Sequence, residues 1–179
     1  MTVNDNVSFG ISAFGPILTF DGDVTANSNG SDGIIAQGNS TLTFGGAVTA
    51  NDNGTGIYAS GSTLTFGGNV TVEDNTHKGI ELWNKSSIIF NSTDVDLPST
   101  VEAQSILYAD GTESTITIGD GVELDALVTA SESINQNKIE FLGSATVKQA
   151  IGESDKPRHE VRFLSTSQNF AATAQNFSE

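Results

Sequence analysis

Short runs that alternate apolar and polar residues recur along most of the chain. In the clearest copy these runs are Thr41–Phe44, Ala47–Ala50 and Gly56–Ala59. Alternation with a period of two is typical of β-strands that have one buried and one exposed face. Gly45-Gly46 and Asn51–Gly54 separate the runs, and both segments are rich in residues that readily form turns. The pattern therefore predicts three short strands joined by tight turns.

The whole three-run segment is repeated at a nearly constant spacing. TLTFGGAVTANDNGTGI begins at Thr41, TLTFGGNVTVEDN begins at Thr63, and ILTFDGDVTANSNG begins at Ile17. The last residues of the successive first runs are separated by 24, 22, 24, 28 and 23 residues, and they are Phe20, Phe44, Phe66, Phe90, Ile118 and Phe141. Strands this short cannot enclose a core alone, so the repeats must stack on one another. The sequence predicts an all-β fold, a right-handed three-sided parallel β-helix of about six coils.

The alternation also predicts which side chains fill the interior of this solenoid. They are Leu42, Phe44, Val48 and Ile57 in one coil and Leu64, Phe66, Val70 and Ile80 in the next. The alternate residues of the first strand are threonines, which we expect on the outside. With 22 to 24 residues in each coil, equivalent side chains should lie directly above one another.

Three asparagines recur in register with the repeat. Asn29, Asn53 and Asn75 each follow the valine of the second strand by five residues. Stacked amides would form an inward-facing ladder that satisfies turn carbonyls and neighbouring amides. Alternatively, these residues occupy the turns because asparagine tolerates a left-handed backbone. The sequence leaves both interpretations open.

We expect residues 1–164 to form a single β-helix domain. Residues 91–104, which contain Pro98, depart from the repeat and predict an insertion or a distorted coil. Residues 165–179 are polar and weakly patterned, which predicts a frayed or truncated terminal segment.

The charge of the chain excludes several classes of partner. The 22 acidic and 7 basic residues give a net charge of −15, and no lysine or arginine precedes Lys78. Nucleic acids require a basic surface, so we expect no nucleic-acid partner. The chain has no cysteine and therefore no disulfide or thiolate metal site. It also lacks a long apolar run and a signal peptide, so an exported parent protein would have to be longer than this chain.

The repeats resemble those of a known family of surface proteins. TLTFGGAVTANDNGTGI at 41–57, TLTFGGNVTVEDN at 63–75 and IEFLGSATVKQAIGES at 139–154 are similar to the passenger regions of rickettsial surface cell antigens, the outer-membrane-protein-B type of autotransporter. The resemblance covers residues 17–165. Gly45-Gly46-Ala47-Val48 also fits the GGA phrase of chlamydial polymorphic membrane proteins, whose FxxN partner is matched only at residues 66–69.

The resemblance implies a place and a role. It implies a rod on the extracellular side of the bacterial outer membrane that attaches to a protein or glycan of the host cell. In the full-length protein it implies neighbouring coils and a membrane-embedded β-barrel beyond this chain. Neither family supplies catalytic residues or a cofactor.

The residues themselves offer little catalytic chemistry. Some polysaccharide-cleaving β-helices place acidic residues together on one strand to bind calcium or to act as acid and base. Here the carboxylates are scattered and mostly fall in turns, as for Asp21, Asp23, Glu73, Asp74 and Asp120. His77 and His159 are far apart and do not predict a metal site. We therefore expect no enzyme activity, no cofactor and no metal.

The sole tryptophan marks the best candidate contact point. Trp83 follows Ile80 and Leu82, which alternation places inside, so Trp83 should face outward near His77, Lys78 and Lys85. An exposed aromatic side chain beside basic residues is a plausible contact for a partner. The alternative is a tryptophan that only covers a turn. Five further basic residues mark either a ligand face or a protected strand edge, and they are Lys138, Lys148, Lys156, Arg158 and Arg162.

Three functions remain open from the sequence. The first is a structural and adhesive surface module that displays loops for host-cell attachment. The second is a polysaccharide-active β-helix enzyme, a lyase or hydrolase, which requires acidic and basic side chains to converge on one strand. The third is a binder of flat ice or glycan surfaces that uses the aligned pairs Thr41/Thr43, Thr63/Thr65 and Thr115/Thr117.

Overall fold

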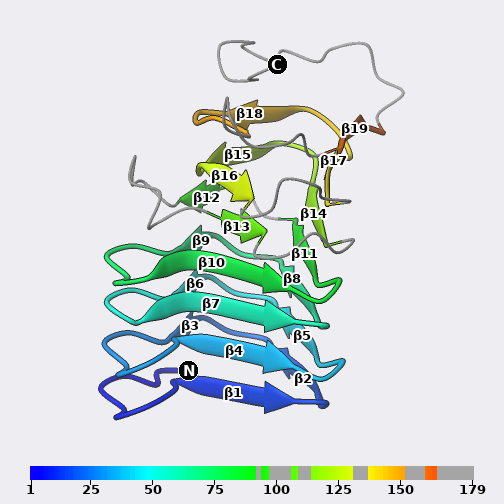
Figure 1. The fold of residues 1–179 in the computed structure, drawn as a ribbon. Coiled ribbons are helices and arrows are strands. Elements are labelled where there is room, and N and C mark those ends of the chain that lie inside the picture. Colours follow the sequence, from blue (N-terminus) through cyan, green and yellow to red (C-terminus); the bar gives the residue numbers. More distant parts are fainter. Residues whose placement is uncertain (92–93, 97–105, 109–113, 131–136, 152–159, 165–179) are drawn as a thin grey trace.

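The computed structural model is a solenoid in which one chain winds through three parallel sheets (Figure 1). It describes residues 1–91, 94–96, 106–108, 114–130, 137–151 and 160–164. All of the regular elements in these ranges are β-strands, and every strand pairing is parallel. The described part of the chain therefore contains no helix that could cross a membrane.

Each sheet collects every third strand of the coils. The first sheet consists of β1 (Ile11–Phe14), β4 (Ile34–Gln37), β7 (Thr55–Ser60), β10 (Lys78–Trp83), β13 (Ile106–Tyr108) and β16 (Val128–Ala130). The second consists of β2 (Ile17–Phe20), β5 (Thr41–Phe44), β8 (Thr63–Phe66), β11 (Ser87–Phe90), β14 (Thr115–Ile118), β17 (Lys138–Phe141) and β19 (Glu160–Phe163). The third consists of β3 (Val24–Thr25), β6 (Val48–Thr49), β9 (Val70–Thr71), β12 (Asp94–Asp96), β15 (Val122–Asp125) and β18 (Ala145–Val147). The predicted three-sided parallel β-helix is confirmed.

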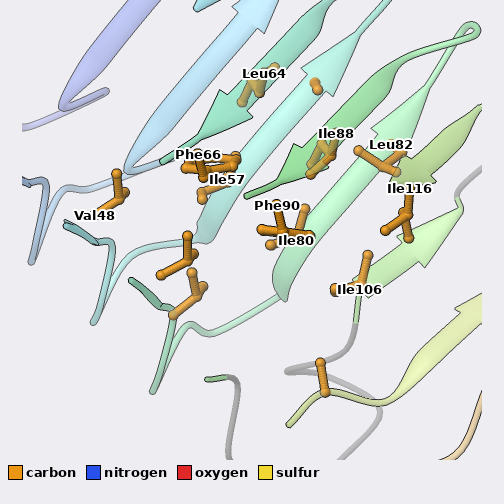
Figure 2. Close-up of a cluster of buried hydrophobic side chains, with 14 of the residues drawn as sticks. Val48, Ile57, Leu64, Phe66, Ile80, Leu82, Ile88, Phe90, Ile106 and Ile116 are labelled. Atoms are coloured by element: carbon orange, nitrogen blue, oxygen red, sulfur yellow. The ribbon is translucent and has the colours of Figure 1, made fainter. Parts of the chain in front are cut away.

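The core is a set of columns that run along the axis of the solenoid. All eight side chains predicted to face inward are at most 1% exposed. Phe20, Phe44, Phe66 and Phe90 form a continuous stack, with ring centroids 5.0, 5.0 and 5.5 Å apart. Figure 2 shows the aliphatic side chains of the first and second sheets packed beside this stack. Full burial of Phe44, Phe66 and Phe90 stabilises the fold by about 1.5 to 3 kcal/mol for each ring, so the repeat itself generates the stability.

The asparagine ladder exists, and it lies at the corner before the first sheet. Asn53 Oδ1 accepts hydrogen bonds from the backbone and side-chain nitrogens of Asn29, at 2.9 and 3.0 Å. Asn75 Oδ1 accepts from the backbone nitrogen of Asn53 at 2.9 Å, and Asn53 Nδ2 donates to Ala26 O. These asparagines are at most 3% exposed. The ladder interpretation is therefore correct.

The left-handed backbone falls one residue before each ladder asparagine. Ser28, Asp52 and Asp74 have φ values of 55°, 57° and 54°. The asparagine at the next position can then turn its amide inward. The left-handed turn residue and the inward-facing ladder asparagine are therefore neighbours in the sequence. Each of the two interpretations describes one of these two positions.

A serine ladder occupies the corner between the first and second sheets. Ser62 Oγ accepts from the backbone nitrogen of Ser40 at 3.2 Å, and Ser114 Oγ accepts from that of Ser86 at 3.1 Å. Asn137 Oδ1 takes the same role for Ser114, at 3.0 Å. These residues are at most 3% exposed. The sequence carries the signal for this ladder, because a serine directly precedes the strand of the second sheet in four successive repeats.

Glycine is required where the backbones of successive coils meet at the third corner. A Cβ atom on Gly68 would lie 2.3 Å from the carbonyl carbon of Gly46. At Gly22, the equivalent position two coils earlier, a Cβ atom would have nothing within 4 Å. Aspartates at this corner also bind the next coil, because Asp23 Oδ1 accepts from the backbone nitrogen of Ala47 at 2.9 Å.

Part of the irregular segment 91–104 forms a strand of the third sheet. Within residues 91–104, β12 pairs with both β9 and β15 in the third sheet, so the coil continues through 94–96. Residues 97–104 lie outside the described part, as does the terminal segment 165–179. For those two segments the insertion and the frayed end stay predictions.

Candidate functional site

The structure places the four predicted contact residues at two ends of one strand. His77 and Lys78 lie at the start of β10, whereas Trp83 ends it and Lys85 follows in the turn. Five extended residues span about 16 Å, so the indole does not lie beside His77 and Lys78. Strand length therefore separates His77 and Lys78 from Trp83, whereas Lys85 stays near it. Trp83 does face outward, since Ile80 and Leu82 are fully buried.

The real neighbours of Trp83 come from the preceding coils. Trp83 pairs with Ser60 of β7, which pairs with Gln37 of β4, which in turn pairs with Phe14 of β1. These four residues form one column on the outer face of the first sheet, and Tyr58 stands beside Ser60 two residues earlier along β7. We call these five residues the aromatic strip. It has aromatic side chains at both ends and polar side chains between them.

Hydrogen bonds fix the polar middle of the aromatic strip. The side chains of Ser60 and Gln37 lie close enough to the phenol group of Tyr58 to oppose the rise in its pKa. Asn84 Nδ2 donates to Ser60 Oγ at 2.8 Å. Side chains held this way lose little freedom when a ligand binds, because they are already ordered.

The aromatic ends of the strip differ in exposure. Phe14 is 80% exposed, and its ring lies over Gly38, where a Cβ atom would approach it to 3.2 Å. Trp83 is half-buried, and its carbonyl accepts from Ser86 Oγ at 2.6 Å. The indole Nε1 of Trp83 is buried and has no hydrogen-bond partner. Such a donor is costly unless an acceptor reaches it.

The electrostatics around the strip are acidic. Tyr58 pairs across the strands with Glu81, and burial raises the pKa of the tyrosine with a further contribution from that carboxylate. Partial burial also raises the pKa of Asp32, although hydrogen bonds from Thr55 oppose the increase. The carboxylates of Glu81 and Asp32 make this face unfavourable for an anionic ligand.

The carboxylates considered for catalysis serve the corners of the coils. Asp120 Oδ1 accepts from the backbone nitrogen and hydroxyl group of Ser144, at 2.8 and 2.9 Å. These hydrogen bonds lower the pKa of Asp120. Asp23 makes the equivalent contact four coils below, so the two carboxylates do not share a strand. Among the described residues, no group of three or more histidines and carboxylates is arranged to hold a metal ion.

The threonine columns align on the outer face of the second sheet. Thr43 pairs with Thr65, and Thr41 pairs with Thr63, so the expected two-residue rows are in register. Ile89 then interrupts the column before Thr117. The regular array of hydroxyl groups is therefore short.

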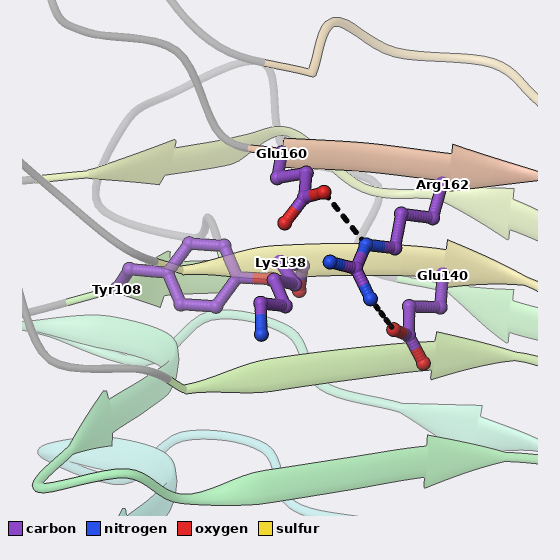
Figure 3. A network of polar contacts seen from close by, with 5 residues as sticks. All are labelled: Tyr108, Lys138, Glu140, Glu160 and Arg162. Atoms are coloured by element: carbon purple, nitrogen blue, oxygen red, sulfur yellow. Dashed lines mark hydrogen bonds and ion pairs between the residues drawn. The ribbon is translucent and has the colours of Figure 1, made fainter.

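The basic residues near the end of the chain are divided between sheets and paired with acids. Arg162 of β19 contacts Glu160 at 2.7 Å and Glu140 at 3.6 Å (Figure 3). Lys148 follows β18 in the third sheet and contacts Glu123 and Asp125. They form no single ligand face. Charged pairs on the outermost described strand of the second sheet agree with the protection of an edge. Lys156 and Arg158 lie outside the described residues.

Figure 3 also shows Tyr108, whose ring points toward Lys138. Tyr108 is fully buried, and its hydroxyl donates to the backbone carbonyl of Lys138. Burial raises the pKa of this tyrosine well above its ordinary value. The bond links the first sheet to the second and gives Tyr108 a structural role.

Sequence reasoning found one residue of the aromatic strip and missed the other four. The missing signal was the alignment of the third runs of the repeats, FGISAF, IIAQ, GIYAS and GIELW. This alignment places Phe14, Gln37, Ser60 and Trp83 in one column.

No family model, curated protein or solved structure matches this chain.

Proposed function

We propose that this chain is a structural and adhesive module of an autotransporter-like surface protein. The proposal is supported by its regular construction, in which side-chain columns continue from coil to coil. The first sheet is six strands deep, which corresponds to a rod about 24 Å long. Each coil is fixed to the next by paired strands, stacked rings and the two ladders. Such a rod holds its outer faces at fixed positions.

The observation that carries the adhesive part is the aromatic strip. Its side chains come from four coils, so only a rigid, in-register stack brings them together. Exposed aromatic side chains next to ordered polar groups are characteristic of binding surfaces. The similarity of the repeats to passenger regions of rickettsial surface antigens points to a host cell as the partner.

The experiment is a cell-binding assay with the purified chain. Fluorescently labelled protein is added to cultured mammalian cells, and the bound fraction is measured against concentration. We expect saturable binding that Trp83→Ala reduces at least tenfold. Thr65→Ala, an outward substitution on the second sheet, is the matched control and should bind like the unmodified chain. Absence of saturable binding by the unmodified chain would leave only a spacer role and would contradict the proposal.

The rival enzymatic function is tested on the same preparation. A polysaccharide lyase or hydrolase shortens its substrate, so reducing ends are measured after incubation with a panel of plant and bacterial polysaccharides. The adhesive module releases none. Release that is lost on substitution of a carboxylate would replace the adhesive proposal with an enzymatic one.

A further inference from the structure

The aromatic strip suggests the chemical class of its ligand. We propose that it binds an uncharged oligosaccharide laid across β1, β4, β7 and β10. This inference rests on the proposed adhesive function and specifies what that function recognises.

The spacing of the strip suits an extended, narrow ligand. Phe14 and Trp83 are three strand spacings apart, which is about 14 Å. Tyr58 lies between them and one step to the side. The apolar faces of sugar rings stack on aromatic rings, so the two ends of the strip provide platforms for separate sugar units.

The polar groups of the strip match the chemistry of hydroxyl groups. The hydroxyl groups of Ser60 and Tyr58 and the amide of Gln37 can each donate and accept. A sugar hydroxyl can do the same, so it can join the existing network without leaving a group unpaired.

The charges indicate that the saccharide is neutral. The chain carries a net charge of −15, and Glu81 pairs directly with Tyr58. A sulfated or sialylated glycan would meet repulsion at this face. Of the three basic side chains of the earlier candidate cluster, His77 and Lys78 lie at the other end of β10, and Lys85 follows Trp83 in the turn.

A protein partner fits the strip less well. Protein interfaces have a contiguous apolar centre surrounded by polar groups. Here the arrangement is reversed, because Gln37 and Ser60 separate the exposed ring of Phe14 from the half-buried ring of Trp83.

The sole tryptophan makes the test direct. Trp83 fluorescence is recorded while chitotetraose, maltotetraose, a lactosamine tetrasaccharide or a heparin tetrasaccharide is added to the full chain, and each titration is repeated by calorimetry. We expect at least one of the neutral sugars to bind and heparin to have no effect. In calorimetry, Trp83→Ala and Phe14→Ala should each weaken binding at least tenfold. Trp83→Phe, which keeps a ring and removes the N–H donor, should weaken it by a smaller factor.

Two controls separate loss of the site from loss of the fold. Each variant must keep the circular dichroism spectrum of the unmodified chain, and Thr65→Ala must bind the sugar normally. The inference is overturned if none of the neutral sugars binds, if only heparin binds, or if Trp83→Ala binds as tightly as the unmodified chain.

Its failure can be distinguished from failure of the adhesive function. Host cells are treated either with glycosidases or with a protease before the binding assay. Binding that survives glycosidases and is abolished by the protease would retain adhesion and replace the saccharide with a protein partner. Binding that glycosidases abolish supports the saccharide. A chain that binds a neutral sugar but no cells would retain the site and contradict the host-cell role.

Discussion

Replacement of Asn53 by alanine tests the internal ladder at the most buried of its three asparagines. Asn53 accepts two hydrogen bonds from Asn29 and donates one to Ala26 O, with all three distances between 2.9 and 3.0 Å. The side chain is 1% exposed, so water does not replace these partners in the folded state. Each bond contributes about 1 kcal/mol, and unpaired buried groups cost more. We expect a loss of about 3 to 5 kcal/mol in the free energy of unfolding.

The measurement is urea unfolding followed by circular dichroism. In a chain of this length, the same loss lowers the melting temperature by about 10 °C. Asn51→Ala is the graded control, because its side chain accepts one hydrogen bond, from the backbone of Glu73 at 2.9 Å. It should lose about 1 kcal/mol. Equal losses for the two variants, or a loss below about 1 kcal/mol for Asn53→Ala, would refute the ladder as a source of stability.

Three further substitutions test the core, the corners and the outer carboxylates. Phe66→Ala removes a ring stacked on both faces and should cost about 4 kcal/mol in urea unfolding. Gly68→Ala forces a Cβ atom into the backbone of the preceding coil and should cost about 3 kcal/mol, whereas Gly22→Ala should change stability by less than about 0.5 kcal/mol. The lowered pKa of Asp120 stabilises the fold above its unfolded pKa of about 3.9, and this stability is lost as the pH falls through the folded value. Asp120→Asn should therefore reduce the difference in melting temperature between pH 7 and pH 3.

For each of these three predictions, a specific outcome would contradict the structure. Full stability of the Phe66→Ala variant would mean that the rings are not stacked in a dry interior. Similar losses of stability for Gly68→Ala and Gly22→Ala would mean that the backbones of successive coils do not meet at Gly68. An unchanged pH dependence in Asp120→Asn would remove this carboxylate from the contacts between coils.

The fold could be predicted from the sequence because the same pattern of alternating strands and turns recurs in successive coils. Alternation alone located Leu42, Phe44 and Val48 inside, and the constant spacing then placed Phe44 over Phe66. A parallel stack is the one arrangement that gives every copy of this pattern the same environment. The corners were harder, since glycine, serine and asparagine can form a turn in several ways. Only the register shows that Ser40 and Ser62 form a ladder.

The candidate site could be predicted only in part because it depends on neighbours that are distant in the sequence. The outward position of Trp83 follows from local alternation. Its proximity to Ser60 and Gln37 requires the pairing of three coils, whereas nearness along the chain suggested His77 and Lys78. An extended strand separates residues that a linear sequence places close together.

Disulfide trapping tests the register of the coils most directly, because the chain has no cysteine of its own. Thr43 and Thr65 pair on adjacent strands, so cysteines at both positions would have Cα atoms about 4.8 Å apart, within the range that a disulfide bridges. Cysteines at Thr43 and Ile89 would be two strands apart, about 9.6 Å, and too distant. Under mild oxidation at low protein concentration, we predict an intramolecular disulfide in the first double variant and none in the second. No disulfide in the first variant, or equal yields in both, would contradict an in-register parallel β-helix.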